Sequence, residues 1–196
     1  MKKSFTLFTI VLLLLGAAAC SVQAQYATKG ATEIGGSVSY SSTTQVANGT
    51  AASNSTSLFS FMPYANYFIT NGFSLGVSPG INIFKAAGST SSTTYLLLAI
   101  VPGYTFSTKS NIFPFIEGVV GYGAITTSGS SSTDVSGISF GGKGGIKVLV
   151  GQSGLFSAGL SYMLITLNPK NPPAGADKRN GFDNFALSLG FSVFIQ

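Results

Sequence analysis

The sequence contains no histidine, no tryptophan and a single cysteine, and only 8% of its 196 residues are charged. Globular proteins in water carry about 25% Asp, Glu, Lys and Arg, because these residues coat a solvated surface. Without histidine, the His-assisted nucleophiles of many hydrolases and the common His-based metal sites are not available. A lone cysteine cannot form a disulfide within the chain. We therefore expect no enzyme activity, no cofactor and no metal site.

Long apolar runs are missing as well beyond the N-terminal region. The most apolar internal run, residues 95–101, is closed by Pro102 and Gly103, whereas a transmembrane helix needs about 20 apolar residues. The formal net charge is +5, and Lys2 and Lys3 account for two of those charges, so that +3 remains on the rest of the chain. This charge is too small and too scattered to predict nucleic-acid binding.

Residues 1–24 have the features of a secretory signal peptide. A short basic start precedes an apolar stretch, and small residues follow it. Cleavage after Ala24 fits the usual pattern of small residues loosely, and it would leave residues 25–32 as a short periplasmic segment. Alternatively, Cys20 follows three alanines, as in a bacterial lipoprotein signal, and would then be acylated. Both readings predict export.

From residue 33 onward, apolar side chains alternate with Gly, Ser and Thr. The clearest examples are residues 73–84 and 185–195, where nearly every second residue is Phe, Leu, Val or Ile. A period of two indicates β-strands, and about 9–11 residues suffice for a tilted strand to cross a bilayer. The alternation predicts eight strands, at residues 33–41, 58–69, 73–84, 94–106, 112–125, 138–150, 155–165 and 185–195.

The low charge decides which face of these strands points outward. A soluble barrel needs charged residues outside, but here the second face is Gly, Ser and Thr, which suits the crowded interior of a narrow barrel. A strand in lipid must have both edges paired, so the strands must close on themselves. We predict an all-β fold, a transmembrane antiparallel up-and-down β-barrel of eight strands over residues 33–196.

The predicted connections alternate in length, which is typical of outer-membrane barrels with tight periplasmic turns and longer extracellular loops. Short turns fall near residues 71, 109 and 152. The long polar stretches are residues 42–57, 85–93, 126–137 and 166–184.

Two residue types modify this pattern. Proline cannot donate a hydrogen bond to a strand ladder, so we expect a bulge or strained pairing at Pro63, Pro79, Pro102 and Pro114. Aromatic residues favour the two membrane interfaces. We expect interfacial girdles near the short turns and near the loops, made of Tyr67, Phe73, Phe106 and Phe113, and of Tyr40, Tyr95, Tyr122 and Tyr162.

The few charged residues of the strands fall on inward positions. They are Glu33, Glu117, Lys143 and Lys147. If the fifth and sixth strands form a hairpin about residue 131, Glu117 lies opposite Gly145, with Lys143 and Lys147 on the diagonals. We predict an interior Glu–Lys cluster. It either fills a narrow lumen by charge pairing or forms a constriction that selects or gates ions.

The last long connection is the best candidate for a recognition surface. Prolines stiffen it, and Lys170, Asp177, Lys178 and Arg179 give it charge. Such a loop can hold a shape for an extracellular partner or for anionic lipopolysaccharide. The alternative is an ordinary solvated loop.

The chain resembles the small eight-stranded outer-membrane barrels of Gram-negative bacteria, the OmpX-like proteins and OmpA-like transmembrane domains. Besides the strand pattern, Ser188, Gly190, Val193 and Ile195 match the C-terminal signal read by the barrel-assembly machinery, although Gln196 stands where many such chains have Phe. The resemblance implies an outer-membrane location, insertion by that machinery, and a structural or surface-interaction role with a filled lumen. A narrow porin-like channel for small or apolar solutes is the alternative.

Overall fold

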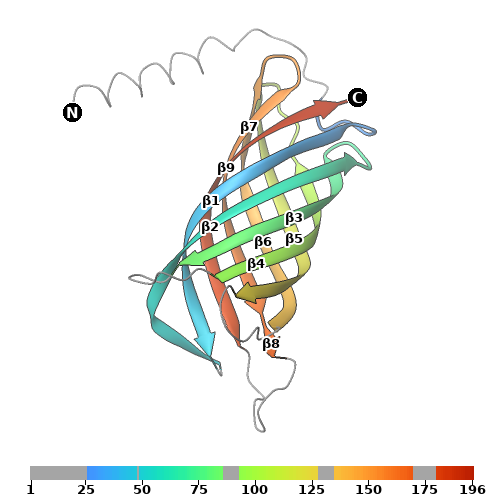
Figure 1. The fold of residues 1–196 in the computed structure, drawn as a ribbon. Helices are drawn as coiled ribbons and strands as arrows, with labels where there is room; N and C mark the ends of the chain where they lie inside the picture. The colour runs from blue at the N-terminus through green and yellow to red at the C-terminus, as the bar shows by residue number, and fades with distance from the viewer. Residues whose placement is uncertain (1–25, 48, 86–92, 128–134, 170–179) are drawn as a thin grey trace, which may run out of the picture.

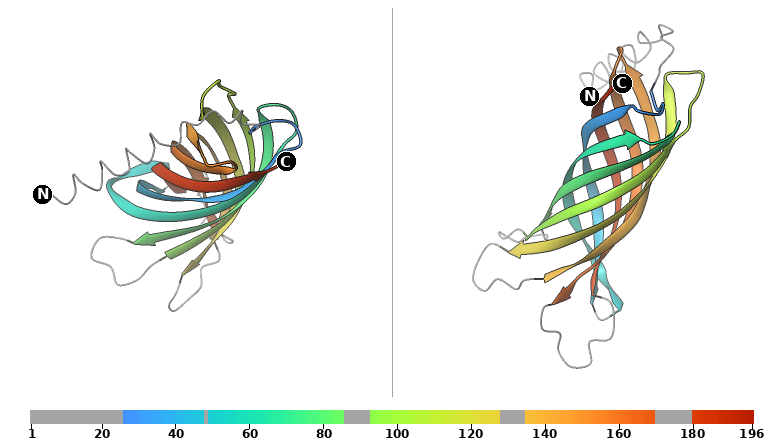
Figure 2. Two further views of the ribbon diagram at one scale, coloured as in Figure 1. Left: turned by 90° about the horizontal axis from the view of Figure 1, so that it is seen from above. Right: turned by 90° about the vertical axis from the view of Figure 1, so that its right-hand side faces the viewer.

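The computed structural model describes residues 26–47, 49–85, 93–127, 135–169 and 180–196. The predicted signal peptide and Cys20 therefore lie outside the described residues. No helix in these ranges is long and apolar enough to cross a membrane. The strands tilt and wrap around one axis (Figure 1, Figure 2). The two ends of the described chain meet at one end of the cylinder, where the Gln196 side-chain amide donates a hydrogen bond of 2.8 Å to the Thr28 hydroxyl.

The described chain forms a closed antiparallel barrel of eight long strands. Each strand pairs with its neighbours in sequence, β7 pairs with β9, and the pairing of β9 with β1 closes the cylinder. The two-residue strand β8 pairs only with β6, at the loop end. The strands are β1 Thr32–Ala47, β2 Thr50–Phe68, β3 Phe73–Lys85, β4 Thr93–Thr105, β5 Ile112–Thr127, β6 Val135–Val150, β7 Gly154–Thr166, β8 Asn168–Pro169 and β9 Gly181–Ile195.

The outer surface is a belt of exposed apolar side chains, which confirms the predicted facing of the strands. Along β9, Leu187 and Phe191 are each 58% exposed, whereas the alternate residues Ser188 and Ser192 are buried. So large a continuous apolar surface is incompatible with water and is the lipid-facing belt of a membrane-spanning barrel. The other strands repeat the pattern, with Ile34, Val77, Leu98, Ile116, Ile138 and Leu160 among the exposed residues.

The predicted loop at residues 42–57 is wrong. β1 continues to Ala47 and β2 begins at Thr50, and the two strands pair as a hairpin that projects at the loop end (Figure 1). Serine and threonine join a backbone ladder as well as apolar residues do, but beyond the lipid neither face needs to be apolar, so the alternation disappears. For the same reason β9 begins at Gly181 rather than at residue 185.

Two members of the predicted aromatic girdles lie inside the barrel instead. Tyr95 and Phe113 are 1% and 2% exposed. Each has exposed neighbours in its strand, Leu96 beside Tyr95 and Ile112 beside Phe113, so strand alternation points both rings into the lumen. The Tyr95 hydroxyl shares a hydrogen bond of 2.6 Å with that of Ser139.

Proline interrupts the ladders at three of the four expected positions. The β2–β3 ladder stops between Phe61 and Ala65, where Pro63 lies, and Pro79 falls in the matching gap of β3. The β4–β5 ladder lacks the pair that Pro102 would make. Pro114, in contrast, keeps its pairing with β6 and lies just beyond the end of the β4–β5 ladder.

Candidate functional site

A buried cluster of charges occupies the lumen. Lys147 of β6 places its Nζ 2.8 Å from Glu33 Oε2 of β1 and 3.3 Å from Glu117 Oε1 of β5. The side chains of Lys147 and Glu33 are 3% and 0% exposed, and that of Glu117 is 12% exposed. The structure thus brings together three of the four predicted residues.

The partner of Glu117 on β6 lies two residues from the predicted one. Glu117 lies opposite Lys143, and Phe115 lies opposite Gly145. The predicted hairpin is centred one residue too far along the Ser/Gly-rich loop, and such an error shifts every pairing partner by two residues. Lys147, four residues further along β6, still reaches Glu117 because the lysine side chain is long.

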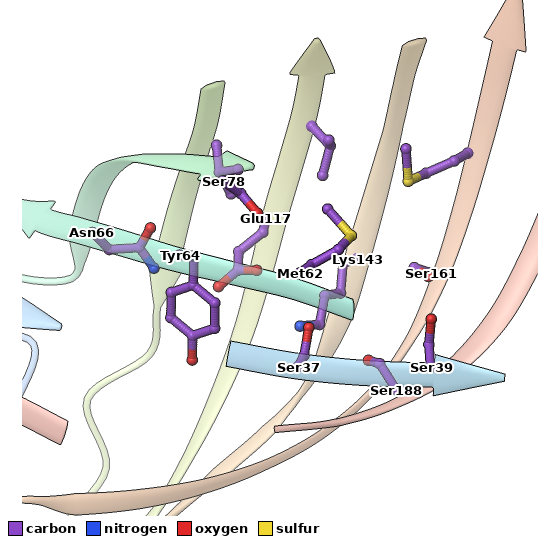
Figure 3. Close-up of a pocket in the computed structure, with 13 residues that line it drawn as sticks. Ser37, Ser39, Met62, Tyr64, Asn66, Ser78, Glu117, Lys143, Ser161 and Ser188 are labelled. Atoms are coloured by element: carbon purple, nitrogen blue, oxygen red, sulfur yellow. The ribbon is translucent and has the colours of Figure 1, made fainter. Parts of the chain in front are cut away.

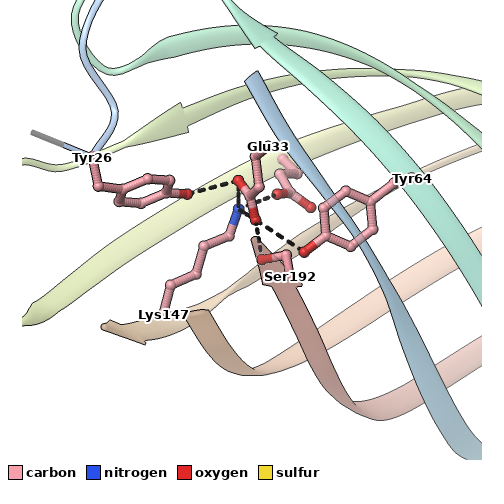
Figure 4. A network of polar contacts seen from close by, with 6 residues as sticks. Tyr26, Glu33, Tyr64, Lys147 and Ser192 are labelled. Atoms are coloured by element: carbon pink, nitrogen blue, oxygen red, sulfur yellow. Dashed lines mark hydrogen bonds and ion pairs between the residues drawn. The ribbon is translucent and has the colours of Figure 1, made fainter. Parts of the chain in front are cut away.

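Glu33 is held by three hydroxyl groups in addition to the ammonium. Tyr26, Tyr64 and Ser192 donate hydrogen bonds of 2.7, 3.0 and 2.8 Å to its carboxylate (Figure 4). A buried carboxylate needs such donors, since an unpaired charge in this environment would cost several kcal/mol. None of the three is among the site residues predicted from the sequence. Tyr64 and Ser192 occupy inward-facing positions of their strands, which the alternation could have indicated, whereas Tyr26 precedes the first strand and carries no such signal.

Lys143 is the one predicted residue that is not paired. Among the described residues it takes part in no ion pair, and its Nζ lies 5.5 Å from the centre of the Phe115 ring. It borders an internal cavity of about 50 Å³, which Glu117, Tyr64, Asn66 and several serines also line (Figure 3). This is room for a few water molecules.

The segment before β1 enters the barrel and closes its short-turn end. Tyr26 and Ala27 are 2% and 0% exposed, and the Tyr26 ring packs against those of Phe68, Phe113 and Phe194 at centroid distances of 5.1–5.5 Å. The Gly72 amide donates to the Ala27 carbonyl, at 2.8 Å. Burial raises the pKa of the Tyr26 phenol well above its usual range. A short segment is expected here from the sequence, but its entry into the lumen is not.

The lumen is therefore filled in three layers along its axis. The charge cluster and the small cavity lie in the middle. Below them, at the short-turn end, is an apolar layer made of Tyr26, Ala27, Ala31, Phe68, Phe113, Leu149, Leu155 and Phe194. Towards the loops is a second apolar layer, which includes Leu58, Phe84, Tyr95, Leu97, Ile165 and Leu167. Buried polar side chains, among them Ser60, Asn82 and Ser139, lie between the apolar ones of this second layer. They are hydrogen-bonded within the barrel, Ser60 to Asn82 and Ser139 to Tyr95.

The remaining predicted residues, Lys170, Asp177, Lys178 and Arg179, lie outside the described residues. Within the described ranges, no group of three His, Cys, Asp or Glu side chains is arranged to hold a metal ion.

The sequence matches no protein-family model and no curated relative, but the fold matches solved structures. Neisserial surface protein A (NspA) is 17% identical with a TM-score of 0.64, and the match covers 84% of this chain and 99% of NspA. OprG from Pseudomonas aeruginosa is 15% identical with a TM-score of 0.57, over 89% of this chain and 100% of OprG. Ail from Yersinia pestis is 14% identical with a TM-score of 0.52, over 86% of this chain and 100% of Ail. The predicted eight-stranded fold is confirmed: the chain has the architecture of the small β-barrels of Gram-negative outer membranes.

Proposed function

We propose that this protein is an integral outer-membrane barrel with a structural or surface-interaction role, not an enzyme and not an open channel. The observation that carries the proposal is the layered lumen. An ion on the barrel axis would have to cross two packed layers made mainly of apolar side chains, in which the polar groups are already hydrogen-bonded to one another, and leaving water for such a region costs many kcal/mol. The lumen thus serves as a core that stabilises the barrel.

The interaction surface is then the extracellular side, which we assign to the loop end. The β1–β2 hairpin projects there, and β8 and the start of β9, which flank Lys170, Lys178 and Arg179 in the sequence, lie at the same end. We propose that these cations contact anionic lipopolysaccharide or an extracellular partner. We further propose that the barrel-assembly machinery inserts the chain, on the match of its terminal strand to the signal described above.

Two experiments test this proposal. The first compares the amount of lipopolysaccharide that co-purifies with the wild type and with a variant in which Lys170, Lys178 and Arg179 are replaced by serine. The expected result is a clear reduction, while serine in place of Lys109, at the opposite end of the barrel, leaves the amount unchanged. An equal amount in all three proteins would refute the role of this loop.

The second experiment measures solute entry into liposomes that contain the folded protein. Swelling in an isosmotic solution of a small sugar should match that of protein-free liposomes, whereas a general porin in parallel should produce rapid swelling. Swelling driven by this protein would contradict the closed lumen and favour the porin-like alternative.

A further inference from the structure

The barrel wall has a gap in its hydrogen bonding beside the internal cavity. The β4–β5 ladder pairs Ile100 with Val120 and Gly103 with Glu117, but it lacks the two pairs between them. Pro102 lies in this gap and keeps its place in the ladder with β3, opposite Leu75. Since proline has no amide hydrogen, the donor is missing on the side that faces β5. The two strands are therefore joined less firmly here than above and below.

On the lipid side, this gap lies at the bottom of a hollow. Across from Pro102, the outward position on β5 is Gly118, which has no side chain to cover the wall. The hollow has a volume of about 300 Å³, and its sides include Tyr104 and Ile116, which are 42% and 56% exposed to the membrane. A lipid-facing strand normally carries a large side chain at each outward position. The combination of Pro102 and Gly118 leaves the wall thin.

On the inner side, the same gap borders the cavity. Val101 and Val119, the inward-pointing residues of the two unpaired positions, both line it. Glu117 lines both the cavity and the outer hollow. Pro102 and Gly118, which line the outer hollow, therefore form part of the wall between the two spaces, whereas a packed layer of mainly apolar side chains lies towards each end of the lumen.

We propose that the β4–β5 gap is a side opening through which the cavity exchanges small molecules with the hydrocarbon of the membrane. The cavity lining defines their chemistry. Met62, Met163 and the two valines provide apolar contacts, and methionine adapts its shape easily. Serine hydroxyls and the ammonium of Lys143, which has no ion pair among the described residues, provide polar contacts. The ligand class is a small uncharged molecule with one hydroxyl group and a short alkyl chain, which partitions into lipid and fits a cavity of about 50 Å³.

This inference goes beyond the proposed surface role, and it is tested by the reactivity of a cysteine placed in the cavity. We would introduce Val119→Cys into a chain in which Cys20, the only native cysteine, is replaced by serine. The folded protein in vesicles is treated with methyl methanethiosulfonate, a small uncharged reagent that enters lipid. The control is Ala99→Cys, also inward and buried, where the ladder with β5 is intact. The expected result is a reaction at Val119→Cys at least about tenfold faster than at Ala99→Cys.

Closing the opening identifies the route. Gly118→Val adds a side chain at the hollow, and its Cβ is accommodated, because it meets Pro102 at 3.4 Å, an ordinary van der Waals distance. It should slow the reaction of Val119→Cys by about tenfold. The matched control Gly142→Val adds the same side chain on the neighbouring lipid-facing position, where the β5–β6 ladder is complete, and should leave the rate unchanged. An equal reaction rate of Val119→Cys with and without Gly118→Val would overturn the proposal. It would also be overturned if Tyr26→Ala increased this rate while Gly118→Val did not change it, because the reagent would then enter along the axis.

The ligand class is tested separately with 1-propanol as the probe. It should slow the reaction at Val119→Cys in a concentration-dependent way, while glycerol, which stays out of lipid, should have no effect at the same concentration. If both compounds act equally, or if neither acts, the assignment of ligand chemistry is wrong. A negative result with 1-propanol would not contradict the proposal that the lumen is closed along its axis, because the liposome-swelling assay tests that proposal independently.

Discussion

Replacing Lys147 with methionine tests how the charge cluster stabilises the barrel. Methionine fills a similar volume but removes the cation that lies 2.8 Å from Glu33 and 3.3 Å from Glu117. Glu33 is fully buried, so water cannot replace the lost partner. The barrel must then either hold an uncompensated carboxylate or bind a proton there.

The distances give the size of the effect. With an effective dielectric constant of about 20, the attraction over 2.8 Å is about 6 kcal/mol and that over 3.3 Å is about 5 kcal/mol. Desolvation offsets much of this attraction, and breaking a buried pair typically costs about 3–5 kcal/mol of unfolding free energy. Because Tyr26, Tyr64 and Ser192 still donate to Glu33, we expect a loss of about 3 kcal/mol, at the lower end of this range.

The free energy of unfolding can be measured by urea titration in phospholipid vesicles, followed by circular dichroism because the chain has no tryptophan. The matched control is Lys143→Met, which removes an equally long cation that has no ion pair among the described residues, and it should cost less than about 1 kcal/mol. The double variant Lys147→Met with Glu33→Gln should be more stable than Lys147→Met alone. Equal stabilities of Lys147→Met and Lys143→Met would refute the reasoning.

Three further predictions follow from the same contacts. Tyr26→Ala should reduce the unfolding free energy by about 3–5 kcal/mol in the same titration, because it removes a large buried ring from the apolar layer at the short-turn end and leaves a cavity. A loss below about 1 kcal/mol would mean that the N-terminal segment does not close the barrel. Because the pKa of Tyr26 is raised in the folded state, its contribution to stability is complete below about pH 10 and is lost above it, so Tyr26→Phe should show a weaker decline at alkaline pH. Gly123→Ala should impair folding, since its Cβ would come 2.3 Å from the Tyr95 ring, whereas Gly142→Ala should fold normally; a shift in gel mobility between heated and unheated samples reports both.

The strands and their facing could be predicted because both follow from one period-two pattern under a strong constraint. Ile34 and Val38 point to lipid and Glu33 points inward, as their alternation requires. The same rule identified Glu33, Glu117 and Lys147 as interior residues before any contact was known, because the lumen of a narrow barrel forces inward charges together.

The remaining features depend on interactions that a local pattern does not contain. Tyr26 enters the lumen because Phe68, Phe113 and Phe194 from three different strands form a pocket for its ring, and only the closed barrel creates that pocket. The extension of β1 and β2 beyond the lipid rests on backbone pairing between serines and threonines, which leaves no apolar signal. At Tyr95 and Phe113, the alternation of the strand, which turns these side chains inward, also outweighs the preference of aromatic residues for the membrane interface.

The most direct test of the central claim, a lumen closed along its axis, is a planar-bilayer recording of the protein purified from membranes, with folding verified in the same sample. The account predicts no unitary current steps for the wild type or for Glu117→Ala, because the apolar layers on both sides of the charge cluster remain. Reproducible steps in the wild type whose size changes in Glu117→Ala would establish an ion path through the cluster and contradict the closed lumen.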